Sequence, residues 1–344
     1  MTSQNNQSKL TMNSTATGTS ARRAMICGVG GQDGAYLADL LLAEGYEVIG
    51  TSRDANMMNR DGLQSLGIEG RVRVVSMASN DFRSVLQTLT RVQPDEIYNL
   101  AGQTSVGLSF EQPVEAIESI AIGTLNLLEA LRFLDRPSRF YNAGSSECFG
   151  DTGGSVATEA TPFHPRSPYA VAKVTAHNLV ANYREAYKIF ACTGILFNHE
   201  SPLRPTRFVT QKIIHGACSI ASHPKEQLQL GNLGIHRDWG WAPDYVRAMW
   251  MMLQADVPQD LVIATGRTVS LAYFVEKAFS HFGLNWQDHV RSDASLLRPS
   301  DIEYGAGDPS LAEKSIGWKA AHDVDDVIQR MCEAAAERQA GRGA

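Results

Sequence analysis

Short hydrophobic runs alternate with amphipathic segments along most of the chain. The runs that have the length of buried strands are residues 24–28, 46–51, 72–76, 96–101, 139–143, 190–197 and 261–264. The segments with hydrophobic residues at helical spacing are 35–44, 82–91, 116–134 and 244–255. Because strands and helices alternate, the pattern predicts an α/β protein with a doubly wound parallel sheet. Such sheets bind ligands at the carboxyl ends of their strands.

The turn between the first strand and the first helix is rich in glycine. Gly28, Gly31 and Gly34 are spaced as GxxGxxG, and Gln32 and Asp33 lie between the last two. Glycines in this position permit a tight turn and a close approach of the backbone to a pyrophosphate, at the N-terminus of a helix. A second strand follows at once. The order of strand, turn, helix and strand predicts a Rossmann-like dinucleotide site.

The end of the second strand indicates which dinucleotide binds. An acidic residue there usually holds the ribose diol of NAD, whereas an arginine accommodates the 2′-phosphate of NADP. Here Arg53 comes first and Asp54 follows. We therefore predict NADP, with NAD as the alternative. Residues 55–70 form a polar segment without a clear period and are predicted to be a loop.

Candidate catalytic residues follow the fifth strand and open the next helix. Tyr169 and Lys173 are four residues apart, so they lie one helical turn from each other, where the ammonium can lower the pKa of the phenol. The hydroxyl of Ser145 can share the substrate oxygen, and the group can take a proton from a sugar hydroxyl during hydride transfer. Glu147 adds a second base. The structural alternatives are a surface Tyr–Lys pair and a carboxylate that caps a helix.

The remaining segments suggest the domain organisation. Residues 1–22 are polar and are predicted to be a disordered extension. Residues 23–197 form the dinucleotide-binding domain, with elements returning to it near 235–265. Residues 198–344 form mainly a smaller C-terminal substrate-binding lobe. Residues 198–202 are predicted to be a turn, in which His199 is more typical of a hydrogen-bonded structural histidine than of a ligand.

Composition and charge exclude several classes of protein. The 344 residues are 43% hydrophobic, carry a net charge of -6 and contain no long Lys/Arg run, which argues against a nucleic-acid partner. No apolar run approaches the ~20 residues of a membrane helix. The five cysteines form no CxxC pair and no zinc-like cluster, so we predict buried thiols, no metal and a cytoplasmic location.

Several motifs occur in an order that is more specific than any one of them. They are residues 31–34 (GQDG), 166–173 (RSPYAVAK), 182–187, 194–202 (GILFNHESP), 230–232, 237–240, 244–246, 307–309 and 317–318. On these motifs, the chain from about Ala24 to Trp318 resembles the extended short-chain dehydrogenases/reductases. Within that group it is similar to the GDP-mannose 4,6-dehydratases.

The resemblance implies a lyase with tightly bound NADP. Tyr169, helped by Lys173, takes the proton of the C4 hydroxyl while C4 hydride passes to the cofactor. Glu147 removes the C5 proton, water leaves from C6, and hydride returns to C6. The product is a 4-keto-6-deoxy sugar, and family members form homodimers or homotetramers.

The resemblance also assigns residues to each ligand. The cofactor is expected to contact Gly28, Gly31, Gln32, Asp33, Gly34, Arg53, Leu100, Ala101, Tyr169, Lys173 and His199. The GDP-sugar is expected to contact Ser105, Ser146, Asn198, Lys212, Arg237 and Arg298.

Some positions depart from the family pattern. Ser145 replaces a threonine and Ser105 replaces a histidine. Arg53-Asp54 replaces a pair of arginines, and residues 76–78 replace Gly-Asp-Leu. Residues 203–207, near the expected sugar or oligomer surface, replace Arg-Arg-Gly-Glu-Thr. The C-terminal lobe is also shorter. Because the changes cluster around substrate and cofactor, we predict either GDP-D-mannose or a variant substrate, GDP-D-glycero-D-manno-heptose.

Two other functions stay open at this point. A 4-keto-6-deoxy-sugar reductase or a 4-epimerase would use the same Tyr169 and Lys173, but a reductase would consume NADPH. A protein that only senses the cofactor and catalyses no reaction would not need catalytic residues. The presence of Ser145, Tyr169 and Lys173 together therefore argues against such a sensor.

Overall fold

The computed structural model describes residues 21–296 and 300–342. The predicted extension, apart from its last two residues, and the predicted substrate residue Arg298 therefore lie outside the described residues. None of the helices in the described part of the chain has the length and apolarity that a membrane span requires.

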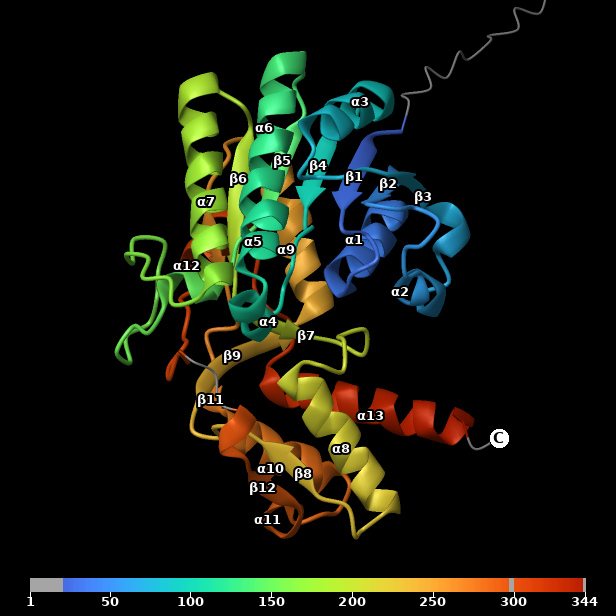
Figure 1. Ribbon diagram of the computed structural model, residues 1–344, viewed down its shortest axis with the longest axis vertical. Coiled ribbons are helices and arrows are strands. Elements are labelled where there is room, and N and C mark those ends of the chain that lie inside the picture. Colours follow the sequence, from blue (N-terminus) through green and yellow to red (C-terminus); the bar gives the residue numbers. More distant parts are fainter. Residues whose placement is uncertain (1–20, 297–299, 343–344) are drawn as a thin grey trace, which may run out of the picture.

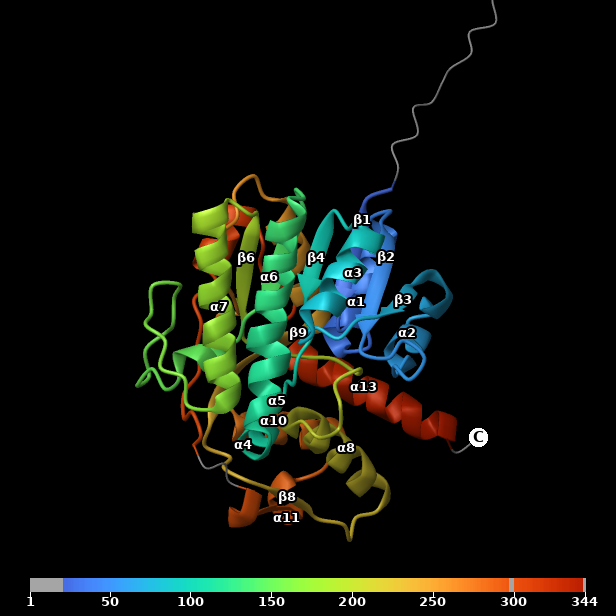
Figure 2. The same cartoon turned by 45° about the horizontal axis from the view of Figure 1, so that its top comes forward.

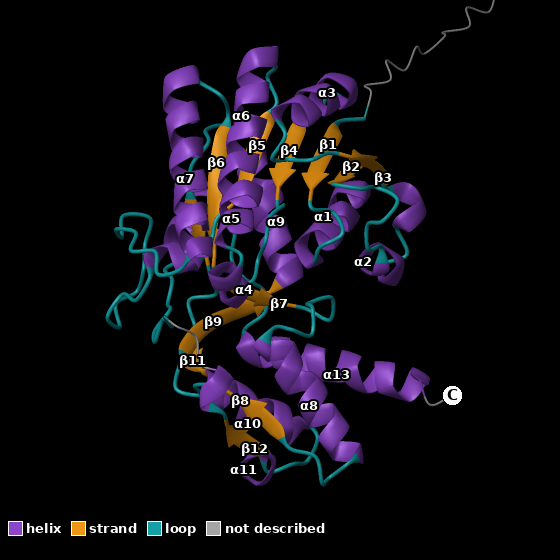
Figure 3. Cartoon of the chain, in the orientation of Figure 1, coloured by secondary structure: helices purple, strands orange, loops and turns teal. Residues whose placement is uncertain are grey.

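The core of the molecule is a seven-stranded parallel sheet (Figure 3). Its strands, in spatial order, are β10 (Leu261–Ile263), β6 (Ala191–Leu196), β5 (Arg139–Ala143), β4 (Glu96–Asn99), β1 (Arg23–Cys27), β2 (Glu47–Ser52) and β3 (Arg73–Ser76). The strand order reverses direction at β1 and β4, so the predicted doubly wound sheet is confirmed.

Helices cover both faces of this sheet (Figure 1). One face packs against α1 (Gln32–Ala43), α9 (Ala242–Gln254) and α12 (Ser310–Ile316), whose apolar residues share one core with the strands. The other face packs against α3 (Phe82–Val92), α6 (Gly123–Leu134) and α7 (Pro168–Tyr187). The predicted helix 116–134 is three pieces in the structure: α5 (Pro113–Ala116), a π-helical segment (Ile117–Ile122) and α6. A short helix, α4 (Val106–Glu111), precedes them.

Two predicted loops are partly regular structure. Residues 55–70 contain α2 (Asp61–Ser65) and the start of a 3-10 turn (Glu69–Arg71), because Leu63 and Ile68 are buried in the core beside α1. The predicted turn at 198–202 contains β7 (Asn198–Glu200), which pairs with β9 (His236–Trp241). A backbone partner from a distant segment, rather than local sequence, makes β7 a strand.

The C-terminal part of the chain has a second hydrophobic core. Its helices are α8 (Val209–Ser222), α10 (Leu271–His281), α11 (Trp286–His289) and α13 (Val324–Arg342), and its strands are β8 (Leu228–Leu230), β11 (Thr268–Ser270) and β12 (Val290–Ser292). Side chains from α8, α10 and α13 interlock in this core. Figure 2 shows this lobe below the large sheet, and Figure 1 shows β9 running between the two parts.

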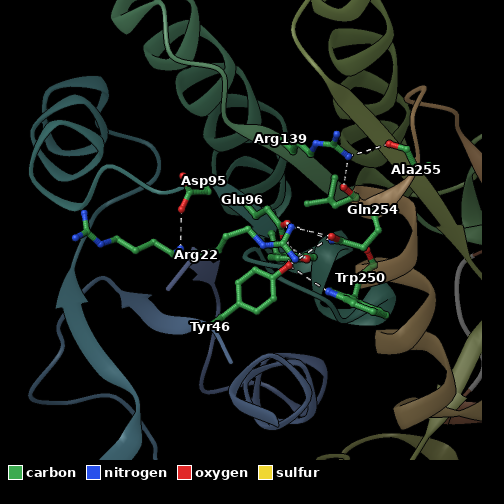
Figure 4. A network of polar contacts seen from close by, with 11 residues as sticks. Arg22, Tyr46, Asp95, Glu96, Arg139, Trp250, Gln254 and Ala255 are labelled. Carbon is green, nitrogen blue, oxygen red and sulfur yellow. Dashed lines mark hydrogen bonds and ion pairs between the residues drawn. The ribbon is translucent and has the colours of Figure 1, made fainter. Parts of the chain in front are cut away.

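A polar network closes the opposite, amino-terminal edge of the sheet (Figure 4). Glu96 is only 1% exposed. Its carboxylate accepts hydrogen bonds from Tyr98 Oη (2.7 Å), Tyr46 Oη (3.0 Å), Gln254 Nε2 (3.1 Å) and Arg22 Nη1 (3.2 Å). The network joins the start of β4 to the end of α9, so it holds that helix against the sheet at the end remote from the glycine turn.

Candidate active site

The glycine turn at the carboxyl end of β1 needs its glycines for steric reasons. Gly28 has φ +88°, a left-handed conformation that favours glycine. A Cβ on Gly34 would lie 2.3 Å from the carbonyl oxygen of Gly28, so any side chain there would push the turn away from α1. The turn can therefore lie close to the helix N-terminus, as a pyrophosphate site requires.

A cavity of about 810 Å³ opens beside this turn. The carboxyl ends of four neighbouring strands line it, through Gly28 and Gly31 (after β1), Arg53 (after β2), Met77 (after β3), and Leu100 and Ala101 (after β4). Its size is typical of small-molecule sites, which span about 300–1,000 Å³. A glycine-rich turn, a helix N-terminus and this volume together fit a dinucleotide. Five of the predicted cofactor residues line the cavity.

Gln32 and Asp33, which follow the turn, contact β7. Asp33 Oδ2 lies 2.9 Å from His199 Nε2, and Gln32 Nε2 donates to the carbonyl oxygen of His199 at 3.2 Å. Burial opposes the charge of Asp33, but the charge of His199 and its hydrogen bond outweigh burial and lower the pKa of Asp33 to about 2. Asp33 in turn outweighs the burial of His199 and raises the pKa of the imidazole. These three residues join the glycine turn to the second lobe, so His199 has the hydrogen-bonded structural setting that its local sequence predicts.

The predicted catalytic residues come together at the carboxyl ends of β5 and β6. Ser145 accepts a hydrogen bond from the backbone of Glu147 (3.3 Å) and begins the short 3-10 helix Ser146–Phe149. Tyr169 is in the first turn of α7, which Ser167 caps, and is hydrogen-bonded to Ser145. Lys173 Nζ lies 5.7 Å from the centre of the Tyr169 ring and donates to the carbonyl oxygen of Ala143 at 2.7 Å. Ser145, Tyr169 and Lys173 are all buried.

Burial dominates the protonation of this group. It raises the pKa of Tyr169, and the opposing effects of Ser145 and of the charge of Arg204 do not reverse the shift. It lowers the pKa of Lys173 to about 8. The expectation that Lys173 gives a lowered phenol pKa therefore does not hold in this structure, because the cost of a buried phenolate exceeds the attraction of nearby cations.

A small pocket lies beside Glu147. It is lined by Ser146, Glu147 and Arg237 together with the apolar side chains of Phe149, Phe197 and Ile302. Arg237, on β9, is 6% exposed, and its Nη2 lies 3.4 Å from Asp301 Oδ1. The pocket brings a carboxylate of the first lobe next to an arginine of β9.

Comparison with known proteins identifies the family. The sequence model of the GDP-mannose 4,6 dehydratase family matches residues 25–331. The chain belongs to this family. It is 43% identical to the GDP-mannose 4,6-dehydratase of Sinorhizobium fredii, with 91% of this chain and 96% of the relative covered. It is 42% identical to GDP-mannose 4,6 dehydratase 1 of Arabidopsis thaliana, covering 90% of this chain and 88% of the relative.

Solved structures share the fold at lower identity. DesIV, a dTDP-glucose 4,6-dehydratase from Streptomyces venezuelae with NAD and TYD bound, has a TM-score of 0.82 and 21% identity over 93% of this chain and 98% of DesIV. The UDP-glucose 4-epimerase of Thermus thermophilus in complex with NAD has a TM-score of 0.80 and 22% identity over 91% of this chain and 98% of the epimerase. These likenesses show that the chain shares the fold of these dehydratase and epimerase structures.

Other residues that the family resemblance assigns to the substrate have contacts within the protein. Ser105 caps α4 by accepting from the backbone of Leu108 at 3.3 Å. Lys212, on α8, donates to the carbonyl oxygen of Gln229 at 2.7 Å. Asn198 pairs with Trp239 in the strand ladder between β7 and β9. Of the predicted substrate residues, Ser146 and Arg237 line the Glu147 pocket, and contacts of the other three with the GDP-sugar stay predictions.

Sequence reasoning missed two arginines after β7. Arg204 Nε lies 3.4 Å from Glu200 Oε2. The positive charge of Arg204 acts to lower the pKa of Tyr169 and the pKa of Asp33, while burial acts to raise both. Burial prevails at Tyr169 but not at Asp33. Arg207 lines the dinucleotide cavity. The expected sugar or oligomer surface at residues 203–207 stays a prediction, but it did not include a contact of Arg207 with this cavity. The only feature of the sequence that could have pointed to these two residues is their spacing, a pair of arginines three residues apart.

The described cysteines are all free and buried, as predicted. Burial raises the pKa of Cys148, the neighbour of Glu147, to about 12, so its thiol stays protonated at neutral pH. Among the described residues, no group of His, Cys, Asp and Glu side chains is arranged to hold a metal ion.

Proposed function

We propose that this protein is a nucleotide-sugar 4,6-dehydratase that acts on a GDP-linked sugar of manno configuration. The single observation that carries the proposal is the position of Glu147, which comes two residues after Ser145 and lines the pocket next to the Ser145–Tyr169 pair. A reductase or an epimerase needs the pair but not a second base. Family membership and the printed names of the relatives agree with a dehydratase.

Each residue has a definite task in the proposed reaction. Tyr169 takes the proton of the C4 hydroxyl, and Ser145 holds the same oxygen through its hydroxyl. The bound dinucleotide supplies the redox chemistry, oxidising C4 and later reducing C6. Glu147 removes the proton of C5, which the C4 ketone acidifies, and Glu147 or a neighbouring hydroxyl returns a proton to the departing C6 oxygen as water. When C6 is reduced, C5 takes up a proton that balances the one Tyr169 took from the C4 hydroxyl, so both residues return to their starting state. The ammonium of Lys173, held by the Ala143 carbonyl, favours the phenolate form from which Tyr169 takes the proton of the C4 hydroxyl, against the burial that raises the pKa of the phenol.

NADP is the proposed dinucleotide. Arg53 lines the cavity, and its side chain is 82% exposed, with Glu115 at 3.7 Å. An exposed ion pair of this kind is worth about 0–1 kcal/mol, so a phosphate can replace Glu115 at little cost. Asp54 accepts hydrogen bonds from the backbone of Asn56 (2.8 Å) and Met57 (3.3 Å). Because these backbone hydrogen bonds occupy the carboxylate of Asp54, it is poorly placed to bind the ribose diol of NAD. The alternative is NAD, which is bound in the solved dehydratase and epimerase structures.

The sugar is proposed to be GDP-D-mannose or GDP-D-glycero-D-manno-heptose. The C6 substituent would enter the pocket beside Glu147, where Thr152 and Ser146 offer hydroxyls among apolar walls. A paired mass-spectrometric assay with both GDP-sugars separates the two. Loss of one water from mannose alone would assign mannose, and faster loss from the heptose would assign the heptose. Assembly into a homodimer or homotetramer stays a prediction, which light scattering would test. A cytoplasmic location also stays a prediction.

The decisive variant is Glu147→Gln. We expect it to lose 10²-fold or more of dehydratase turnover, the typical contribution of a general base, while binding the dinucleotide with unchanged affinity. Glu44→Gln, an exposed site after α1, is the matched control and should keep full activity. Turnover of GDP-sugar by Glu147→Gln at the wild-type rate would refute the proposal. Stoichiometric consumption of NADPH by the wild-type protein would favour a 4-keto-6-deoxy-sugar reductase instead.

A further inference from the structure

The walls of the dinucleotide cavity carry few charges. Among its lining residues in the described chain, the charged ones are Arg53, Glu115 and Arg207. All lining residues except Arg207 come from positions 28–119, in strands, loops and the helical segments 113–122 of the first lobe. Arg207 comes from the segment between β7 and α8, which is remote in sequence from the other lining residues.

Two contacts fix this segment beside the glycine turn. Ser201 Oγ donates to Gln32 Oε1 at 2.8 Å and accepts from the backbone of Leu203 at 3.1 Å. The side chain of Leu203 packs against the core that contains Leu63 of α2. A turn between Pro205 and Phe208, closed by a backbone hydrogen bond of 3.1 Å, then presents Arg207. The position of Arg207 therefore depends on contacts within the protein rather than on an unsupported loop.

The two arginines of this segment differ in their charge partners. Arg204 lies 3.7 Å from the centre of the Phe208 ring and faces the carboxylate of Glu200. Arg207 lies 5.1 Å from the same ring and is exposed. No described acidic side chain forms an ion pair with Arg207, whereas Arg53 has Glu115. Of the two arginines that line the cavity among the described residues, Arg207 is therefore the one without an acidic side chain in ion-pair distance.

We infer that Arg207 binds a phosphate group of the dinucleotide, from the second lobe and in the same subunit. The inference rests on the proposed function, since it requires that the cavity bind a dinucleotide. A guanidinium matches the geometry of a phosphate and forms charge-assisted hydrogen bonds with it. The family pattern has threonine at the position of Arg207, so this contact is a feature of this chain. A bound phosphate would join the segment after β7 to the glycine turn by a second link besides Ser201–Gln32.

Calorimetric titration of the full-length, cofactor-free protein with NADP⁺ and with NAD⁺ tests the inference. Arg207→Gln should weaken binding about 10–100-fold, the usual value of a charge-assisted hydrogen bond, and Arg207→Lys should restore part of it. Arg91→Gln removes an exposed charge near the C-terminal end of α3, at the opposite edge of the sheet, and should leave both affinities unchanged. Thermal melting of each variant checks that it folds.

The pattern of loss assigns the phosphate. Equal weakening for the two dinucleotides means that Arg207 holds the pyrophosphate, and weakening for NADP⁺ alone means that it holds the 2′-phosphate. Unchanged affinities in a folded Arg207→Gln protein would overturn the inference and leave the proposed function standing. Failure of the wild-type protein to bind either dinucleotide would overturn both.

Discussion

His199 Nε2 lies 2.9 Å from Asp33 Oδ2 and links β7 to the helix that follows the glycine turn. The other ring nitrogen lies 2.8 Å from the carbonyl oxygen of Phe197, and the ring stacks on Tyr245 at 4.5 Å. An imidazole that donates from both nitrogens is protonated. Asp33 and His199 therefore form an ion pair that holds the cofactor turn against the second lobe.

Removing one partner should weaken both stability and cofactor binding. We expect Asp33→Asn to lower the free energy of unfolding by about 1–3 kcal/mol, since the pair is largely but not fully buried. Denaturant titration measures the change, and dinucleotide affinity should fall with it because the turn loses its tether. Asp39→Asn, an exposed position of α1, is the control. Equal effects of the two substitutions would mean that the pair stabilises nothing.

The same pair predicts the direction of a pH dependence. The folded pKa of Asp33 is lowered from 3.8 to about 2, so its contribution is present above pH 3.8 and is lost as pH falls toward 2. The folded pKa of His199 is raised above 6.5, so its contribution is present below pH 6.5 and is lost as pH rises through the folded pKa. The stability difference between wild type and His199→Asn should thus be largest at about pH 4–6.5. A constant difference from pH 4 to 9 would indicate a neutral imidazole.

The hydroxyl of Tyr169 should matter mainly for the reaction, although the family resemblance also places this residue against the cofactor. Tyr169→Phe removes only a hydroxyl and should reduce turnover about 10²–10⁴-fold, as expected for loss of the acid–base group. Dinucleotide affinity, measured by titration, should change little. Tyr187→Phe, at the 49% exposed end of the same helix, should have neither effect. A Tyr169→Phe protein that turns over at half the wild-type rate would remove Tyr169 from the mechanism.

Glu96 should support stability from the edge of the sheet away from the active site. Glu96→Ala leaves four hydrogen-bond donors without their acceptor, and we expect a loss of about 3 kcal/mol in the free energy of unfolding. Glu47→Ala breaks surface ion pairs with Arg23 and Arg73, and should cost less than about 1 kcal/mol. Turnover per folded molecule should be unchanged in both variants. Equal stability losses would show that burial of Glu96 adds nothing.

The sequence alone determined the features that depend on local spacing. The alternation of strands and helices, the glycines at 28, 31 and 34, and the four-residue step from Tyr169 to Lys173 each reflect contacts within one element or between chain neighbours. Backbone sterics and helical periodicity fix such features before distant parts of the chain meet. The parallel sheet and the location of the catalytic group after β5 and on α7 followed from them.

Only the tertiary structure decided which distant side chains meet. Asp33 and His199 are 166 residues apart, and β7 is a strand because β9 pairs with it. Arg207 reaches the dinucleotide cavity because Ser201 bonds to Gln32 and Leu203 packs against the first lobe. Burial, which no residue spacing encodes, reverses the expected shift of the Tyr169 pKa. These outcomes depend on the packing of one lobe on the other, and local patterns of hydrophobic and polar residues carry no information about that packing.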